Sequence, residues 1–171
     1  MTIIDEFPPA LAAVAGLEFP YDREEDIDYE PHDSFMSVGE TEDWWRALTG
    51  NPAPAGPGFR VFGQDGTGGY AAFWLVRPDA PVADQPVVFL GSEGERGVVA
   101  KDLAAYLWLL ADGSGPMEAV AYGAWASSPR PELVAIARTY APEREQRAAD
   151  IIAEARAEFP DFDAMVEAQI R

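Results

Sequence analysis

The stretch FRVFGQDGTGGYAAFWLV, residues 59–76, predicts two β-strands joined by a tight turn. Apolar and polar side chains alternate over residues 59–62, and residues 70–76 are rich in aromatic and apolar side chains, as is typical of strands. The turn between them contains Asp-Gly and Gly-Gly pairs, which tolerate the positive φ angles of hairpin turns. We therefore expect an antiparallel hairpin with positive φ, in an exposed turn, at one or more of Gly66, Gly68 and Gly69.

The glycine-rich turn at residues 63–69 does not fit either of two common phosphate-binding motifs. A P-loop needs a lysine directly after its last glycine, but the only lysine of the chain is Lys101. A dinucleotide-binding fingerprint needs a helix at the same place, whereas residues 70–76 have a strand pattern. The tip of a hairpin is therefore the favoured interpretation.

Two further strands and a series of helices follow from the hydrophobic pattern around this hairpin. Residues 86–91 and 97–100 are apolar runs separated by a short turn, which favours a meander over β-α-β units. The hydrophobic period changes from about two to about 3.6 near residue 101. The helices expected from this period and from Pro and Gly boundaries cover residues 8–15, 40–48, 101–111, 116–124, 131–140, 143–159 and 162–170.

These elements predict an α+β fold, in which a small, mainly antiparallel central sheet is flanked by helices. The length of 171 residues suits one domain. We expect residues 1–125 to form this α+β domain. Residues 126–171 are expected to form C-terminal helices that pack on the domain or extend it.

The composition excludes several classes of functional site. The chain has no cysteine and one histidine, His32, which rules out disulfides, Cys-ligated metal centres and sites built on several histidines within one chain. Its 30 acidic and 12 basic residues give a net charge of −18, which repels nucleic acid and anionic membranes. The first residues lack the pattern of a secretory signal, and no apolar run reaches the roughly 18 residues of a membrane span. We expect a cytoplasmic protein that binds neither nucleic acid nor membrane.

Residues 22–30 (DREEDIDYE) form an acidic segment that holds six acidic residues and one arginine. Acids occupy every second position, so an extended chain would place five carboxylates on one side. An EF-hand beginning at Asp26 is excluded, because its sixth and twelfth positions are Pro31 and Ser37 rather than Gly and Glu. Three interpretations remain open: a solvated face, a loose site for Mg²⁺ or Ca²⁺, and a docking surface for a basic partner.

His32 and the Trp44-Trp45 pair are weaker candidates for a functional site. His32 precedes Asp33 and Ser34, but a catalytic triad needs three side chains that converge in space, which neighbours in sequence rarely do. Adjacent tryptophans lie about 100° apart on a helix, so both can be half-buried at the edge of a core, or one can form a stacking platform. We favour core packing, and we assign no catalytic residue, cofactor or metal.

Four segments, at residues 62–74, 85–95, 98–100 and 107–111, together with the helix at Trp44-Trp45 and the turn at 49–51, resemble the SUKH superfamily. That superfamily includes a fungal regulator of cell-wall synthesis and many bacterial proteins. The resemblance covers residues 35–120 and fades beyond residue 125. It implies a single α+β domain that binds other proteins. Many bacterial members resemble immunity proteins that neutralise polymorphic toxins, often nucleases, and the superfamily has no catalytic motif to carry over.

The resemblance and the acidity together favour an immunity protein that neutralises a polymorphic toxin, such as a nuclease, through an acidic surface. Carboxylates can mimic the phosphates that a basic nuclease binds, and their charge speeds association. The alternatives are an intracellular adaptor or regulator on the same scaffold and, in third place, a hydrolase that uses carboxylates or a bound cation. The residues expected to contact a basic toxin domain are Asp22, Glu24, Asp26, Asp28, Tyr29, Glu30 and Trp44.

Overall fold

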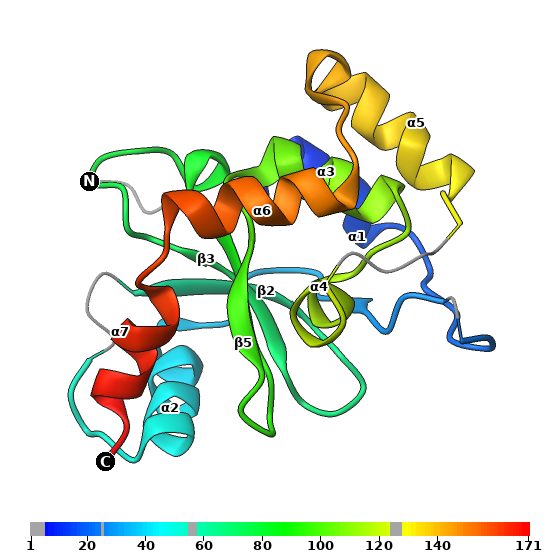
Figure 1. Cartoon of the computed structure of the whole chain (residues 1–171). Coiled ribbons are helices and arrows are strands. Elements are labelled where there is room, and N and C mark those ends of the chain that lie inside the picture. The colour runs from blue at the N-terminus through cyan, green and yellow to red at the C-terminus, as the bar shows by residue number, and fades with distance from the viewer. Residues whose placement is uncertain (1–5, 25, 55–57, 124–127) are drawn as a thin grey trace.

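The computed structural model describes residues 6–24, 26–54, 58–123 and 128–171. Its centre is a five-stranded sheet with the strand order β1-β2-β3-β4-β5, in which every neighbouring pair is antiparallel (Figure 1). The strands are β1 Glu30–Pro31, β2 Phe59–Gln64, β3 Tyr70–Trp74, β4 Val87–Leu90 and β5 Arg96–Ala100. The expected α+β meander is confirmed, and the two-residue strand β1 adds an edge that the sequence pattern did not indicate.

Seven α-helices and two 3₁₀ turns accompany the sheet in the described parts of the chain. The helices are α1 Pro9–Ala15, α2 Val38–Thr49, α3 Leu103–Ala111, α4 Pro116–Ala121, α5 Pro131–Tyr140, α6 Ala148–Glu158 and α7 Phe162–Gln169. The 3₁₀ turns are η1 Val82–Asp84 and η2 Pro142–Arg144. The expected helix at 143–159 is divided, because α6 begins only at Ala148, whose N–H donates to Asp112 Oδ2 at 2.8 Å.

Both faces of the sheet are covered, because apolar side chains occupy successive positions of its central strands. In β4, Val87 and Phe89 point to one face, and Val88 and Leu90 point to the other. The first face packs against α3 and α4, and α1 and α5 add a further layer in which α5 contacts both α3 and α1. The second face packs against α2 and α7, while α6 lies against β5 and contributes to both clusters (Figure 1). A sheet buried on both faces explains why these strands read as continuous apolar runs.

A β-bulge in β2 alters the register beside the acidic segment. The pairing with β3 shifts between Val61 and Gly63, so Phe62 is an extra residue on the bulged strand. Val61 and Phe62 are both fully buried, in the clusters on opposite faces of the sheet. Gly63 has no room for a side chain, since a Cβ there would lie 2.5 Å from the Tyr29 ring. The bulge therefore positions the ring that anchors the acidic segment.

The β2–β3 turn confirms the expected hairpin, and a buried carboxylate shapes it. Gly68 is exposed and has a φ of 93°, as the glycine pattern predicted. Asp65 is only 2% exposed, and its Oδ1 accepts hydrogen bonds from the N–H groups of Thr67, at 3.0 Å, and Gly69, at 2.8 Å. The turn thus satisfies its own backbone donors with a side chain from its first residue.

The C-terminal helices share their core with the rest of the described chain. Leu133 of α5 belongs to the same apolar cluster as Phe62 of β2. Phe162 of α7 packs edge-on against Trp74 of β3, with ring centroids 5.0 Å apart. The expected boundary between residues 125 and 126 lies outside the described residues. None of the helices described is both long enough and apolar enough to cross a membrane.

Candidate partner-binding surface

The acidic segment, residues 22–30, forms a turn that is anchored in the core. The Asp26 carboxylate accepts hydrogen bonds from the N–H groups of Asp22 and Arg23, both at 2.9 Å, and these bonds lower the pKa of Asp26. Ile27 is 2% exposed and belongs to the larger apolar cluster. Of the described residues of the segment, only Glu30 lies in a strand, so the extended chain that would place five carboxylates on one side is not formed.

Asp28 connects the acidic segment to two distant parts of the chain. Its Oδ1 accepts a hydrogen bond from the Gly66 N–H in the β2–β3 turn at 2.9 Å. Its own N–H donates to Glu118 Oε2 on α4 at 3.0 Å. Asp26 and Asp28 thus hold the shape of the segment, so a substitution at either position would change structure as well as charge.

Tyr29 was expected to contact a partner, and the structure corrects this expectation. The side chain is 4% exposed, and its ring meets Phe19 edge-on with centroids 5.1 Å apart. Burial raises the pKa of the Tyr29 hydroxyl above its ordinary value. Ile27 and Tyr29 are buried, whereas the neighbouring Asp26 and Asp28 are partly exposed and accept backbone N–H groups. Among the described acids of the segment, Asp22, Glu24 and Glu30 are exposed.

A hollow of about 660 Å³, which we call the Trp44 hollow, lies on one side of β1. Half-buried Trp44 of α2 and Tyr70 of β3 meet there edge-on, with ring centroids 5.5 Å apart. His32 Nε2 and Gln64 Oε1 lie 2.9 Å apart in the same lining. The acidic residues of the lining are Glu30, Asp33, Glu40 and Asp43. The structure therefore brings together Glu30 and Trp44, two of the expected contact residues.

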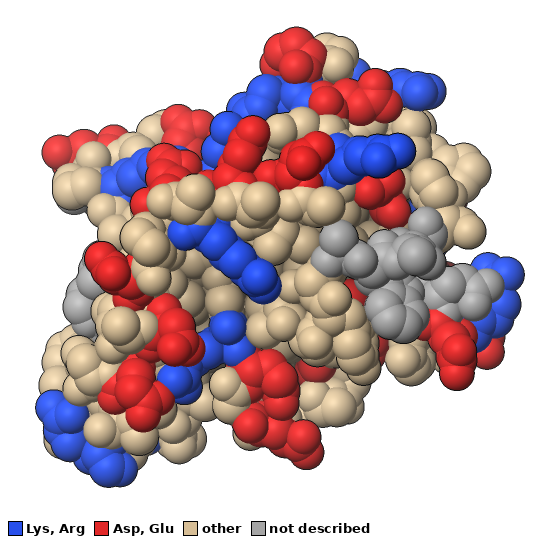
Figure 2. All heavy atoms as spheres, viewed as in Figure 1, with Lys and Arg blue, Asp and Glu red and all other residues tan. Residues whose placement is uncertain are grey.

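The lining of the Trp44 hollow is acidic, and one of its four acids, Asp43, is paired with an arginine outside the lining. Glu40 caps the first turn of α2, and Asp43 Oδ1 lies 2.7 Å from Arg46 Nη1. Glu30 and Asp33 are exposed, and the lining contains four acids without a lysine or arginine. On the face shown in Figure 2, by contrast, acidic and basic side chains are interleaved over α5 and α6. A concave surface lined by one sign of charge attracts ligands of the opposite sign.

A second hollow, of about 470 Å³, lies on the other side of β1, and we call it the Phe19 hollow. Phe19 is half-buried, whereas Tyr21 is 59% exposed. The acidic residues of this lining are Glu18, Asp28 and Glu30. Both residues of β1 border both hollows, so β1 forms the ridge between them. We call the two hollows and this ridge the acidic face.

Glu118 lies next to the acidic face, and the sequence reasoning did not single it out. It is 5% exposed on α4, and its Oε1 has no hydrogen-bond partner among the described residues. Burial raises the pKa of Glu118 to about 7. The carboxylates of Asp28 and Asp65 add to this effect, and the hydrogen bond from the Asp28 N–H opposes it. The one sequence feature that indicated a buried carboxylate here was an acid inside the apolar run PMEAVA, residues 116–121.

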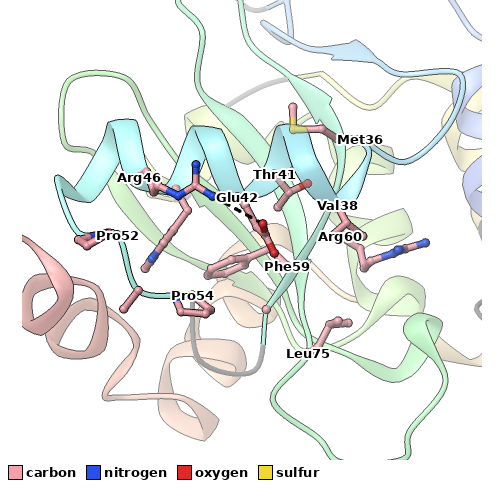
Figure 3. A pocket seen from close by; sticks show the side chains of 13 residues that line it. Met36, Val38, Thr41, Glu42, Arg46, Pro52, Pro54, Phe59, Arg60 and Leu75 are labelled. Carbon is pink, nitrogen blue, oxygen red and sulfur yellow. Dashed lines mark ion pairs between the residues drawn. The ribbon is translucent and has the colours of Figure 1, made fainter.

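A third hollow, of about 350 Å³, lies between α2 and the start of β2 (Figure 3). Its apolar walls include Met36, Val38, Phe59 and Leu75. The ion pair between Glu42 and Arg46, with 3.7 Å between the charged atoms, lies beside it. Apolar walls of this kind do not distinguish one occupant from another, so we assign this hollow no function.

The described residues do not bring three or more His, Asp or Glu side chains into a group that would hold a metal ion. The loose Mg²⁺ or Ca²⁺ site considered for the acidic segment therefore has no support from the described geometry. The His32 ring meets Gln64 and, at 6.1 Å between centroids, Tyr70.

In comparisons with known proteins, no family profile, curated protein or solved structure matches this chain. The function is therefore argued from the acidic face.

Proposed function

We propose that this chain is a non-catalytic binding protein whose acidic face takes a basic protein partner. The observation that carries the proposal is the Trp44 hollow, where two packed aromatic rings lie among four carboxylates. Protein interfaces concentrate their binding energy in a central group of aromatic side chains surrounded by a polar rim. A rim of one charge adds long-range attraction for a partner of the opposite charge.

Within this function we propose toxin immunity, which the resemblance to SUKH proteins supports. A nuclease toxin carries basic residues that hold phosphate, so a surface of carboxylates can occupy the same groups. The net charge of −18 favours rapid association with such a partner. A toxin that acts inside the cell is met in the cytoplasm, which is the location we propose.

The proposal is tested with a variant that removes charge from the acidic face and leaves its supports intact. Three acids stay unchanged, because their carboxylates hold backbone N–H groups; these are Asp26, Asp28 and Glu40. The face variant combines two exposed acids of the acidic face, Glu30→Gln and Asp33→Asn, with two exposed acids of the adjoining acidic segment, Asp22→Asn and Glu24→Gln. The control variant changes net charge equally at other exposed positions, with Glu93→Gln, Glu143→Gln, Glu145→Gln and Asp161→Asn.

Association and dissociation rates are measured at low and at physiological salt against the toxin module that the proposal expects to be encoded near this gene. We expect association of the face variant at low salt to slow by about tenfold or more, because charges at the contact steer the encounter. The control variant should lose much less, since screening weakens charges beyond about 10 Å from the contact. Trp44→Ala should act mainly on the dissociation rate, as central aromatic contacts do. Equal losses in the face and control variants would remove the acidic face from the interface.

A further inference from the structure

We infer that the Phe19 hollow receives an arginine side chain of the basic partner. This inference rests on the proposed function and names the group that one part of the acidic face recognises. Three observations support it: the walls of the hollow, an arginine of this chain that already packs at its edge, and the negative charge around it.

The Phe19 hollow has walls suited to a planar cation. Its volume is about 470 Å³, and its lining includes Leu17, Phe19 and Tyr21. The Tyr21 side chain is 59% exposed, so most of its surface is open to a ligand. A guanidinium group gains free energy when it stacks on such a ring, and the gain is larger where water is partly excluded, as in a hollow.

An arginine of this chain already uses one wall of the hollow. The Arg130 guanidinium lies over the Phe19 ring, 4.9 Å from its centroid, and its Nη2 donates to the Glu18 carbonyl oxygen at 3.2 Å. Its charge is compensated by an ion pair with Glu132. The segment around Phe19 therefore already holds one guanidinium group on an aromatic ring and a backbone acceptor, and Tyr21 is the exposed ring of the lining that remains for a second.

Carboxylates make the hollow electrostatically negative. Glu18, Asp28 and Glu30 belong to its lining, and Glu118 accepts the Asp28 N–H at 3.0 Å. Partial desolvation raises the pKa of the Tyr21 hydroxyl, and the nearby charges of Asp28 and Glu118 raise it further. Tyr21 therefore sits in a negative potential, which disfavours a second anion and stabilises a cation at the same place.

This combination of ring and carboxylate selects arginine over lysine. Guanidinium is planar, stacks on aromatic rings and donates to a carboxylate through a fork of N–H groups. The lysine ammonium is a compact, strongly hydrated charge that gains less from a ring. At a partly exposed site, stacking is worth about twofold to fivefold in affinity.

The test uses two blocked tripeptides, Gly-Arg-Gly and Gly-Lys-Gly, which are titrated into the full chain while the backbone amide signals are followed by NMR. We expect the arginine peptide to shift the signals of Tyr21, Asp28 and Gly66, and to bind about twofold to fivefold more tightly than the lysine peptide. Tyr21→Ser should abolish this preference. Tyr140→Ser is the matched control, because Tyr140 is a tyrosine on α5 that is 46% exposed, and it should keep the preference.

Equal affinity for the two peptides would overturn the inference, and so would a preference that survives Tyr21→Ser. Shifts at millimolar arginine peptide that spare the lining of the Phe19 hollow would overturn it as well. If any of these results occurs while the face variant still loses association with the toxin, the arginine site fails and the proposed function stands. If the preference is found but the face and control variants lose association equally, the arginine site stands and the proposed function fails.

Discussion

As the pH rises, Glu118→Gln should become more stable relative to the wild type, because it removes a buried carboxylate that ionises in the wild type. Glu118 is 5% exposed, and burial raises its pKa from an ordinary 4.5 to about 7. Between these two pH values the folded chain holds the proton and the unfolded chain does not. The free energy of unfolding therefore falls as the pH rises from 4.5 to about 7, and the loss is complete above that range.

The magnitude of the effect follows from the two pKa values. A difference of roughly 2.5 in pKa corresponds to about 3 kcal/mol at 25 °C. Glutamine does not ionise, and its carbonyl oxygen can accept the Asp28 N–H that Glu118 Oε2 accepts at 3.0 Å. Its amide nitrogen replaces Oε1, and an imperfectly paired amide costs about 1–3 kcal/mol at every pH. The expected result is a pH-dependent difference, in which the variant gains about 3 kcal/mol on the wild type between pH 4.5 and pH 8.

Urea unfolding followed by tryptophan fluorescence, at several values between about pH 4.5 and 8.5, gives the free energies of unfolding of both proteins. Glu143→Gln is the matched control, because it changes the same chemical group at an exposed position of η2. The control should leave the pH dependence almost unchanged. A difference between wild type and Glu118→Gln that is the same at every pH would refute the reasoning, since it would mean that the buried carboxyl titrates like an exposed one.

Three further substitutions test one close steric contact and two sets of hydrogen bonds. Gly69→Ala should lower the free energy of unfolding by about 1–3 kcal/mol, because its Cβ would lie 2.6 Å from Phe89 Cζ; an unchanged thermal midpoint would show that Phe89 moves aside. Asp65→Ala should cost about 1–3 kcal/mol and speed hydrogen exchange of the β2–β3 turn amides, and unaltered exchange would contradict the role of its carboxylate. Trp108→Phe removes the Nε1 donor that lies 2.8 Å from the Ala141 carbonyl oxygen and should cost about 1–3 kcal/mol in urea unfolding; a neutral effect would mean that this carbonyl finds another donor.

The strands and the β2–β3 turn were predictable because their determinants are local. Side chains that alternate along residues 70–74 belong to opposite faces of the sheet, and the sheet is buried on both. Gly68 takes positive φ where the turn composition placed it. The helical spacing of the two tryptophans predicted two half-buried rings; Trp44 is half-buried, whereas Trp45 is 1% exposed because it packs against Phe59 of β2.

The candidate site was only partly predictable. Two of the expected contact residues, exposed Glu30 and half-buried Trp44, share a hollow. The high acidity of residues 22–30 concealed the inward-facing Ile27 and Tyr29, whose burial depends on surfaces from other elements. The partners of Trp44 in its hollow come from β1, β3 and the loop before α2, and no local pattern placed them together.

Composition and local pattern alone established the acidity, the absence of cysteine, the antiparallel meander and most helix boundaries, because each depends on residue types or on neighbours a few positions apart. The tertiary structure alone decided which acids are supports and which are exposed. Asp28 is a support because its carboxylate accepts the N–H of Gly66, 38 positions away in the sequence. Burial likewise raises the pKa of Glu118 only once α4 packs against the sheet. Such properties depend on desolvation by distant segments, and a chain carries no local record of them.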